Sequence, residues 1–191
     1  MGWQDVTPSD AVEVAAWIAP RLLPFDEYRL GSVIPTGFAR YVRLAPRSRL
    51  ADVLRRHTTT PDRCWLCLWD GYGDLTGAIA TYTFVWSRDT PEHLRRPQPP
   101  PPKPKLRSSR VRLPHRDYLL FAGSVEQGDG WERGPNLWWP DDRSWVVASE
   151  IDLDSTSVAG PRALIDAILT APALESAAGA PITLDSDTLN G

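Results

Sequence analysis

The chain has 191 residues, is 42% hydrophobic and carries a formal net charge of −3. This length and composition predict one globular domain with a core of its own. The acidic balance gives no reason to expect nucleic acid or an anionic membrane as a partner. No apolar run approaches the roughly 20 residues that span a bilayer. The N-terminus also lacks the basic and apolar regions of a secretory signal, so we expect a cytoplasmic protein.

The first third of the chain predicts three helices. A Thr-Pro start, which suits a cap and a first helical position, opens a helix over 7–18 with apolar residues at helical spacing. A proline is expected to open a short second helix over 35–42. Apolar residues three and four apart then predict a third helix over 48–57.

The only two cysteines, Cys64 and Cys67, stand in the motif CWLC. This spacing occurs in redox-active pairs and in halves of zinc sites. A structural zinc site needs four ligands, and neither a second cysteine pair nor a histidine cluster accompanies this one. Because the run over 64–69 has the composition of a strand, the two thiols are expected to be buried and to face opposite ways.

From Cys64 onward, period-two patterns and short apolar runs indicate strands. They are predicted at 64–69, 78–86, 117–123 and 144–153. A helix follows from Gly160-Pro161, and Ile182 with Leu184 could add an edge strand.

These elements predict an α+β fold, in which a single, mainly antiparallel sheet of about four to six strands is packed on one face by N- and C-terminal helices. Residues 1–191 form a single domain in this interpretation. The run QPPPPPKPK indicates a flexible insertion at about 95–110, since proline lacks the N–H that helices and central strands need. The C-terminal tail is polar.

The segment over 135–143 is a tryptophan-rich loop in this interpretation. Trp138 and Trp139 are adjacent and bounded by prolines, so one ring is expected to pack while the other lines a cleft. An exposed tryptophan beside Asn, Asp and Arg is typical of a pocket that stacks sugars or nucleobases, or of a protein-binding hot spot. The alternative is that both rings cap an open end of the sheet.

Three carboxylates after this loop share one face of the predicted strand over 144–153 and its end. Such a face either binds a divalent cation or is solvated and paired with arginines, and the second interpretation is favoured. No metal or cofactor is therefore expected. The predicted ligand- or partner-binding residues are Asn136, Trp138, Trp139, Asp141, Asp142, Arg143, Glu150, Asp152 and Asp154.

Several stretches resemble a family of uncharacterised actinobacterial proteins: GSVIPTGFARYVRL, HTTTPDRCWLCLWDGYG, LPHRDYLLFAG, PNLWWPDDRSWVVASEIDLDST and RALIDAIL. That resemblance implies no function. The segment LGSVIPTGFARYVRL also resembles the helix opening of the SUKH immunity superfamily, although it lacks the Asn-Gly that usually follows. This second resemblance implies an α+β scaffold that binds toxins and other partners.

The sequence thus favours a non-enzymatic module that binds an unknown protein partner or small ligand through the tryptophan-rich loop. Trp139→Ala is then expected to weaken binding and to leave the melting temperature nearly unchanged. The alternative is a hydrolase or a nucleotide- or sugar-processing enzyme, with Asp141 or Asp142 paired with Glu150 or Asp152 as general acid and base. No nucleophile-elbow or zinc-protease motif supports the alternative.

Overall fold

The computed structural model describes residues 6–24, 30–46, 49–72, 109–131, 134–150, 155–172, 174 and 178–182. The chain divides into two compact units, one formed by Met1–Trp69 with Ser108–Gly191 and the other by Asp70–Arg107. Only residues 70–72 of the second unit are described. The account below therefore concerns the first unit, and the single-domain prediction stays a prediction.

Nine strands of the described chain form one sheet in which every pairing is antiparallel. The order is β1-β5-β3-β6-β7-β8-β2-β9, and β4 pairs with β5 beside β1. The predicted α+β class with an antiparallel sheet is confirmed, with more strands than expected. The strands are β1 Thr7–Pro8, β2 Arg40–Leu44, β3 Cys64–Trp69, β4 Arg110–Arg112, β5 Asp117–Gly123, β6 Leu137–Pro140, β7 Val146–Ala148, β8 Thr156–Gly160 and β9 Ala178–Ile182.

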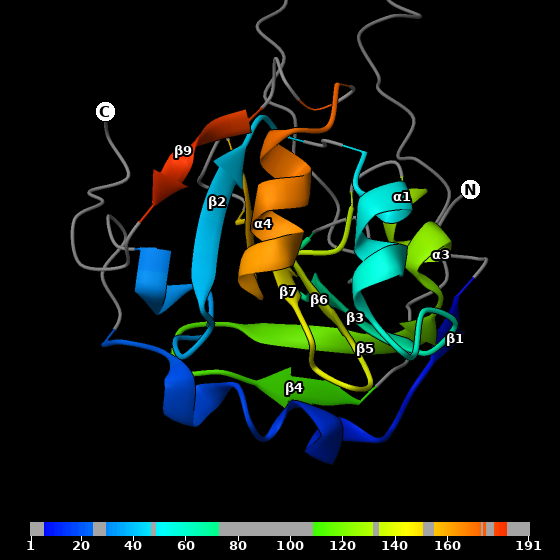
Figure 1. Cartoon of the computed structure of the whole chain (residues 1–191). Helices are drawn as coiled ribbons and strands as arrows, with labels where there is room; N and C mark the ends of the chain where they lie inside the picture. The colour runs from blue at the N-terminus through cyan, green and yellow to red at the C-terminus, as the bar shows by residue number, and fades with distance from the viewer. Residues whose placement is uncertain are drawn as a thin grey trace, which may run out of the picture. The chain divides into compact units, whose positions relative to one another are not determined.

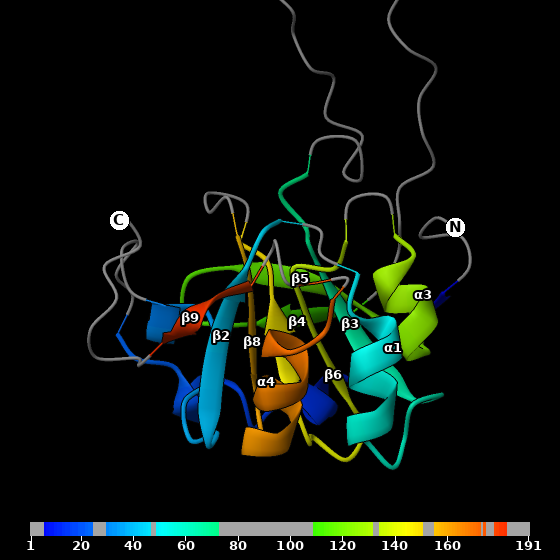
Figure 2. The ribbon, with the colours of Figure 1, turned by 45° about the horizontal axis from the view of Figure 1, so that its top comes forward.

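Apolar side chains on both sides of the central strands mean that both faces of the sheet are covered. Short 3-10 turns from the N-terminus, η2 Val12–Ala15, η3 Ala19–Arg21 and η4 Leu30–Ser32, pack on what we call the N-terminal face. The opposite, helical face is covered by α1 Ala51–Leu54, α3 Val125–Asp129 and α4 Arg162–Leu169 (Figures 1 and 2). The N-terminal turns and α4 thus lie on opposite faces rather than on one.

Two of the predicted N-terminal helices are wrong. In place of a helix over 7–18, Thr7–Pro8 pairs with β5 and only isolated 3-10 turns follow. The predicted helix over 35–42 is replaced by β2, in which Tyr41 and Arg43 share one face and Val42 and Leu44 the other. Sheet pairing on both sides of β2 outweighs the helical spacing of its apolar residues.

The other elements agree more closely with the predictions. The strands at 64–69 and 117–123 and the helix after Gly160-Pro161 are confirmed. The third helix is confirmed in shorter form, as α1 followed by a 3-10 turn, η5 Arg55–His57. Of the strand predicted over 144–153, residues 146–148 form β7, and residues 151–153 lie outside the described part of the chain. β9 supplies the edge strand that includes Ile182.

Cys64 and Cys67 are unpaired thiols, 1% and 0% exposed, in the centre of the sheet. Their odd spacing on β3 directs them to opposite faces, as predicted. Burial raises the pKa of Cys64 to about 12, and burial also raises the pKa of Cys67 far above its usual range. Both thiols are therefore protonated at neutral pH, and neither is a reactive nucleophile.

Several predictions concern residues outside the described part of the chain. They are the strand over 78–86, the insertion up to residue 108, the residue pair Asp152 and Asp154, and the tail after Ile182. The C-terminal end of the predicted insertion is described, and there Arg110 begins β4.

Candidate functional site

Trp138 and Trp139 do not lie in an exposed loop. They belong to β6, and they are 3% and 0% exposed. Because neighbouring strand residues point to opposite faces, each ring enters a different covered layer of the fold. The expectation that one ring lines an open cleft is wrong, since the structure provides two cores rather than one.

Close contacts hold each ring in its layer. On the helical face, Trp138 meets Trp145 edge to face at 5.1 Å, and a Cβ added to Gly128 of α3 would lie 2.7 Å from the Trp138 ring. On the N-terminal face, Trp139 meets Trp17 edge to face at 6.0 Å. These contacts identify both rings as packing residues, so any role in binding has to be indirect.

Asp141, Asp142 and Arg143 form the tight turn between β6 and β7, which we call the turn end of the hairpin. One Asp142 oxygen accepts hydrogen bonds from the Thr58 hydroxyl at 2.9 Å and from the Thr59 N–H and hydroxyl at 2.6 and 2.7 Å. Burial by itself would raise the pKa of Asp142, but these bonds and those from Ser144 outweigh it and lower the pKa to about 2. Asp142 therefore anchors the loop at 58–60, which we call the threonine loop, and it is ionised at neutral pH.

The other two turn residues are also engaged. Asp141 accepts a hydrogen bond from the Trp65 indole at 3.0 Å and pairs with Arg63 at 3.3 Å. Arg143 has a φ of 56°, the left-handed conformation that the turn requires, and its guanidinium carbon lies 5.8 Å from the centre of the Trp17 ring. The turn end is therefore held in place by contacts within the protein.

Asn136, the next predicted binding residue, bridges three strands. Its backbone N–H donates to the Cys67 carbonyl, and its side-chain oxygen accepts a hydrogen bond from the backbone N–H of Trp69. These two bonds continue the hydrogen bonding of β3 beyond the end of β6. Its side-chain amide donates to the Ser149 carbonyl beside β7. The residue is 7% exposed, so it acts as a structural polar link.

Glu150 lies at the other end of the hairpin, which we call the open end. Its carboxylate pairs with the Arg116 guanidinium at 3.1 Å. The Glu150 side chain is 8% exposed and the Arg116 side chain is 15% exposed. The Arg116 guanidinium lies 5.1 Å from the centre of the Trp69 ring. Burial lowers the pKa of the neighbouring His115, and the charge of Arg116 lowers it further, so the imidazole is neutral at pH 7.

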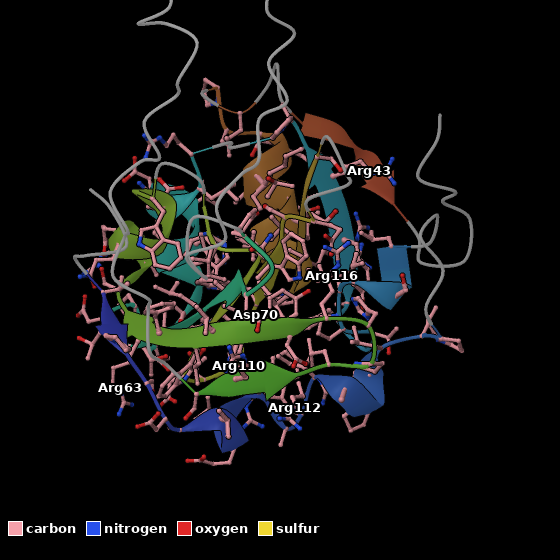
Figure 3. All side chains as sticks on the ribbon, turned by 180° about the vertical axis from the view of Figure 1, so that it is seen from behind. Arg43, Arg63, Asp70, Arg110, Arg112 and Arg116 are labelled. Atoms are coloured by element: carbon pink, nitrogen blue, oxygen red, sulfur yellow. The ribbon has the colours of Figure 1, made fainter. Side chains whose placement is uncertain are left out.

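Arg43 of β2 lies on the same face as this group. The register places it beside Ser157 of β8 and, two strands away at roughly 10 Å, in line with Ala148 of β7. Figure 3 shows Arg43 and Arg116 from that side, both above β5 in the view. The Nε and Nη2 atoms of Arg43 are buried and have no hydrogen-bond partner among the described residues.

The predicted site residues are thus divided between two places. Asp141, Asp142 and Arg143 lie at the turn end, Glu150 lies at the open end, and the two tryptophans are buried between them. The sequence reasoning missed Arg43, Trp69 and Arg116. A signal for Arg43 is present in RYVRL, since its alternation places an arginine on a buried strand.

Within the described ranges, no helix is long and apolar enough to cross a membrane. The same ranges contain no group of three or more His, Cys, Asp or Glu side chains placed to hold a metal ion. Comparisons with protein-family models, curated proteins and solved structures found no match, so both resemblances remain expectations and function has to be argued from the site.

Proposed function

We propose that the protein is a non-enzymatic binding module that takes its ligand or partner at the open end of the hairpin. The observation that carries this proposal is the buried ion pair between Arg116 and Glu150 against the partly exposed Trp69 ring. A charge pair removed from water is costly to assemble, and it holds its arginine and the neighbouring ring in a fixed geometry. Such a preorganised aromatic and polar surface is typical of recognition sites.

Three tryptophans among the described residues keep contact with solvent, and all lie on the N-terminal side: Trp17, Trp65 and Trp69. Trp65 is tied to Asp141 at the turn end, and Trp17 is packed against Trp139 and Phe38. Trp69 lies where the strand ladder ends. It also lies against Arg116 of the buried ion pair, so we assign the ligand contact to Trp69.

The enzyme alternative is less well supported by the geometry. Asp141 and Glu150 lie at opposite ends of the hairpin, separated along the strands by roughly 15 Å or more at 3.3 Å per residue. Pairs of carboxylates that cleave glycosidic bonds are about 5 to 9.5 Å apart. Asp142 is committed to the threonine loop and has a pKa of about 2, so it is a poor proton donor at neutral pH.

A thermal-shift screen tests the proposal. The probes are free amino acids, sugars, nucleosides, nucleotides and short carboxylic acids, because ligand binding raises the melting temperature by mass action. We expect a hit whose shift is lost in Trp69→Ala and kept in Trp65→Ala. These two tryptophans lie on the same face of the same strand and are both partly buried, so Trp65→Ala is the matched control.

The ligand is then incubated with the protein and followed by proton NMR. An unchanged ligand supports the binding module, whereas product signals would establish the hydrolase alternative. A hit that survives Trp69→Ala would refute the assigned surface, and a screen without any hit would count against small-ligand binding at this face.

A further inference from the structure

Two buried atoms of Arg43 without a partner among the described residues indicate the chemistry of a ligand. Nε–H and one Nη2–H point in parallel from the same edge of a guanidinium group, and these are the two nitrogens that lack an acceptor among the described residues. Two parallel N–H donors fit the two oxygens of a carboxylate or a phosphate. The edge is thus arranged for an anion with two oxygens.

Arg43 also differs from the other arginines of its surroundings. On the same face, Arg116 has a carboxylate partner in Glu150, and on the opposite face of β2, Arg40 pairs with Asp166 at 3.6 Å. The neighbour of Arg43 on β8 is Ser157, which is 2% exposed and neutral. Arg43 is partly buried, and its two buried donors have no acceptor among the described residues, which is unfavourable. An anionic ligand would relieve that cost.

The backbone beside Arg43 is irregular as well. Between Val42 and Leu44 the chain of β2 advances by two residues, while its partner β9 advances by three, from Pro181 to Ala178. This is a β-bulge opposite Arg43. Bulges redirect side chains and are enriched beside functional sites, so this one is consistent with a side chain positioned for binding.

Other buried donors do not carry the same argument. Four indole N–H groups also lack an acceptor among the described residues. They are neutral, and each of their rings meets another aromatic ring edge to face, so no counter-ion is required. These four belong to Trp17, Trp131, Trp139 and Trp145.

We propose that Arg43 binds the carboxylate or phosphate group of a small ligand on the N-terminal face, with Nε–H and Nη2–H donating side by side. This inference rests on the proposed binding function and names the chemistry of its ligand. Trp69 and the Arg116–Glu150 pair lie on the same face and would contact the remainder of such a ligand.

The test follows the Nε–H signal of Arg43 by ¹H–¹⁵N NMR, with acetate and inorganic phosphate as separate probes. The signal is assigned by its loss in Arg43→Lys, which keeps the charge but removes the parallel donors. We expect one anion to shift this signal saturably. Followed by thermal shift, which does not need the Arg43 signal, the same anion should bind at least about tenfold more weakly to Arg43→Lys and Arg43→Met. The anion that saturates identifies the group as carboxylate or phosphate.

Arg40→Met is the matched control, because it removes the same charge from the same strand on the opposite face. Arg40→Met should bind the anion as tightly as the unaltered protein does. If its affinity falls as much as that of the Arg43 variants, the effect is one of non-specific charge and the inference is refuted. If neither anion shifts the Nε–H signal while a neutral ligand from the thermal-shift screen binds through Trp69, the inference fails and the proposed function stands.

A further outcome concerns the carboxylates of the chain itself. If Asp152→Asn or Asp154→Asn abolishes the protected Arg43 Nε–H signal without any added anion, then the protein supplies its own acceptor and the inference is overturned. If both variants leave that signal and the anion response intact, the ligand assignment is strengthened. Arg43→Lys keeps the test valid should Arg43→Met fail to fold.

Discussion

The turn end and the open end of the β6–β7 hairpin carry similar residue types, but they use their polar groups differently. At the turn end, Asp141 and Asp142 receive hydrogen bonds from Trp65 and from the loop at 58–60. At the open end, Glu150 neutralises Arg116, and Arg43 on the same face keeps two donors without an acceptor among the described residues. A segment rich in acidic and aromatic residues therefore indicates a binding site only where some of the nearby polar groups are not already used in hydrogen bonds within the described structure.

Trp139→Ala, between the two ends, should have the largest effect. Truncating a fully buried tryptophan costs about 3–5 kcal/mol, and the change would also remove the support of Trp17. We expect the midpoint of urea unfolding to fall sharply, whereas the surface interpretation of the sequence expected almost no change. Val12→Ala, at an exposed apolar residue on the N-terminal turns, should change the stability by less than about 0.5 kcal/mol.

Glu150→Gln tests the open end directly. Removing the Glu150 charge breaks this buried ion pair, which costs about 3 kcal/mol. The double variant Arg116→Met/Glu150→Gln should be more stable than Glu150→Gln alone, since both charges of the ion pair are then removed. Both are measured by urea unfolding at neutral pH, and a double variant less stable than the single one would show that the pair is not the stabilising unit.

Asp142→Asn is the corresponding change at the turn end, and it should have the smallest effect. Asp142 is largely exposed, so solvent screening limits its contribution to about 1 kcal/mol. Its folded pKa of about 2 lies below the ordinary pKa of 3.8 for an aspartate, so this stabilisation is present above pH 4 and is lost as the pH falls towards 2.

The measurement is the stability of the original and Asp142→Asn proteins from pH 7 to pH 2. The difference between the two should be constant at higher pH and should shrink below pH 4. A difference that stayed constant down to pH 2 would show that the carboxylate charge contributes nothing, and that only the shape of the side chain matters.

Local sequence patterns predicted the strands at 64–69 and 117–123 and helix α4, because each has strong periodicity or a clear proline start. They failed for β2 and β6. In β6, the prolines on either side of LWWP suggested a loop, but pairing with both β3 and β7 makes it a central strand. Such pairing involves residues far apart in sequence, so the local pattern does not contain it.

The same limit applies to the site. The sequence predicts Glu150 as part of an acidic face and favours its pairing with an arginine. Which arginine would pair with it could not be predicted, since Arg116 and Arg43 come from other parts of the chain. The burial of the two tryptophans could not be predicted either, because it depends on the layers that pack against both faces of the sheet.

The two cysteines of β3 allow the opening of each layer to be timed separately. Cys64 lies beneath the helical layer and Cys67 beneath the N-terminal layer, and neither thiol is exposed in the folded protein. Alkylating reagents attack thiolates that solvent can reach, so labelling has to wait for the covering layer to separate. In the variants Cys64→Ala and Cys67→Ala, alkylation rates would therefore show which layer of the fold separates first and how often.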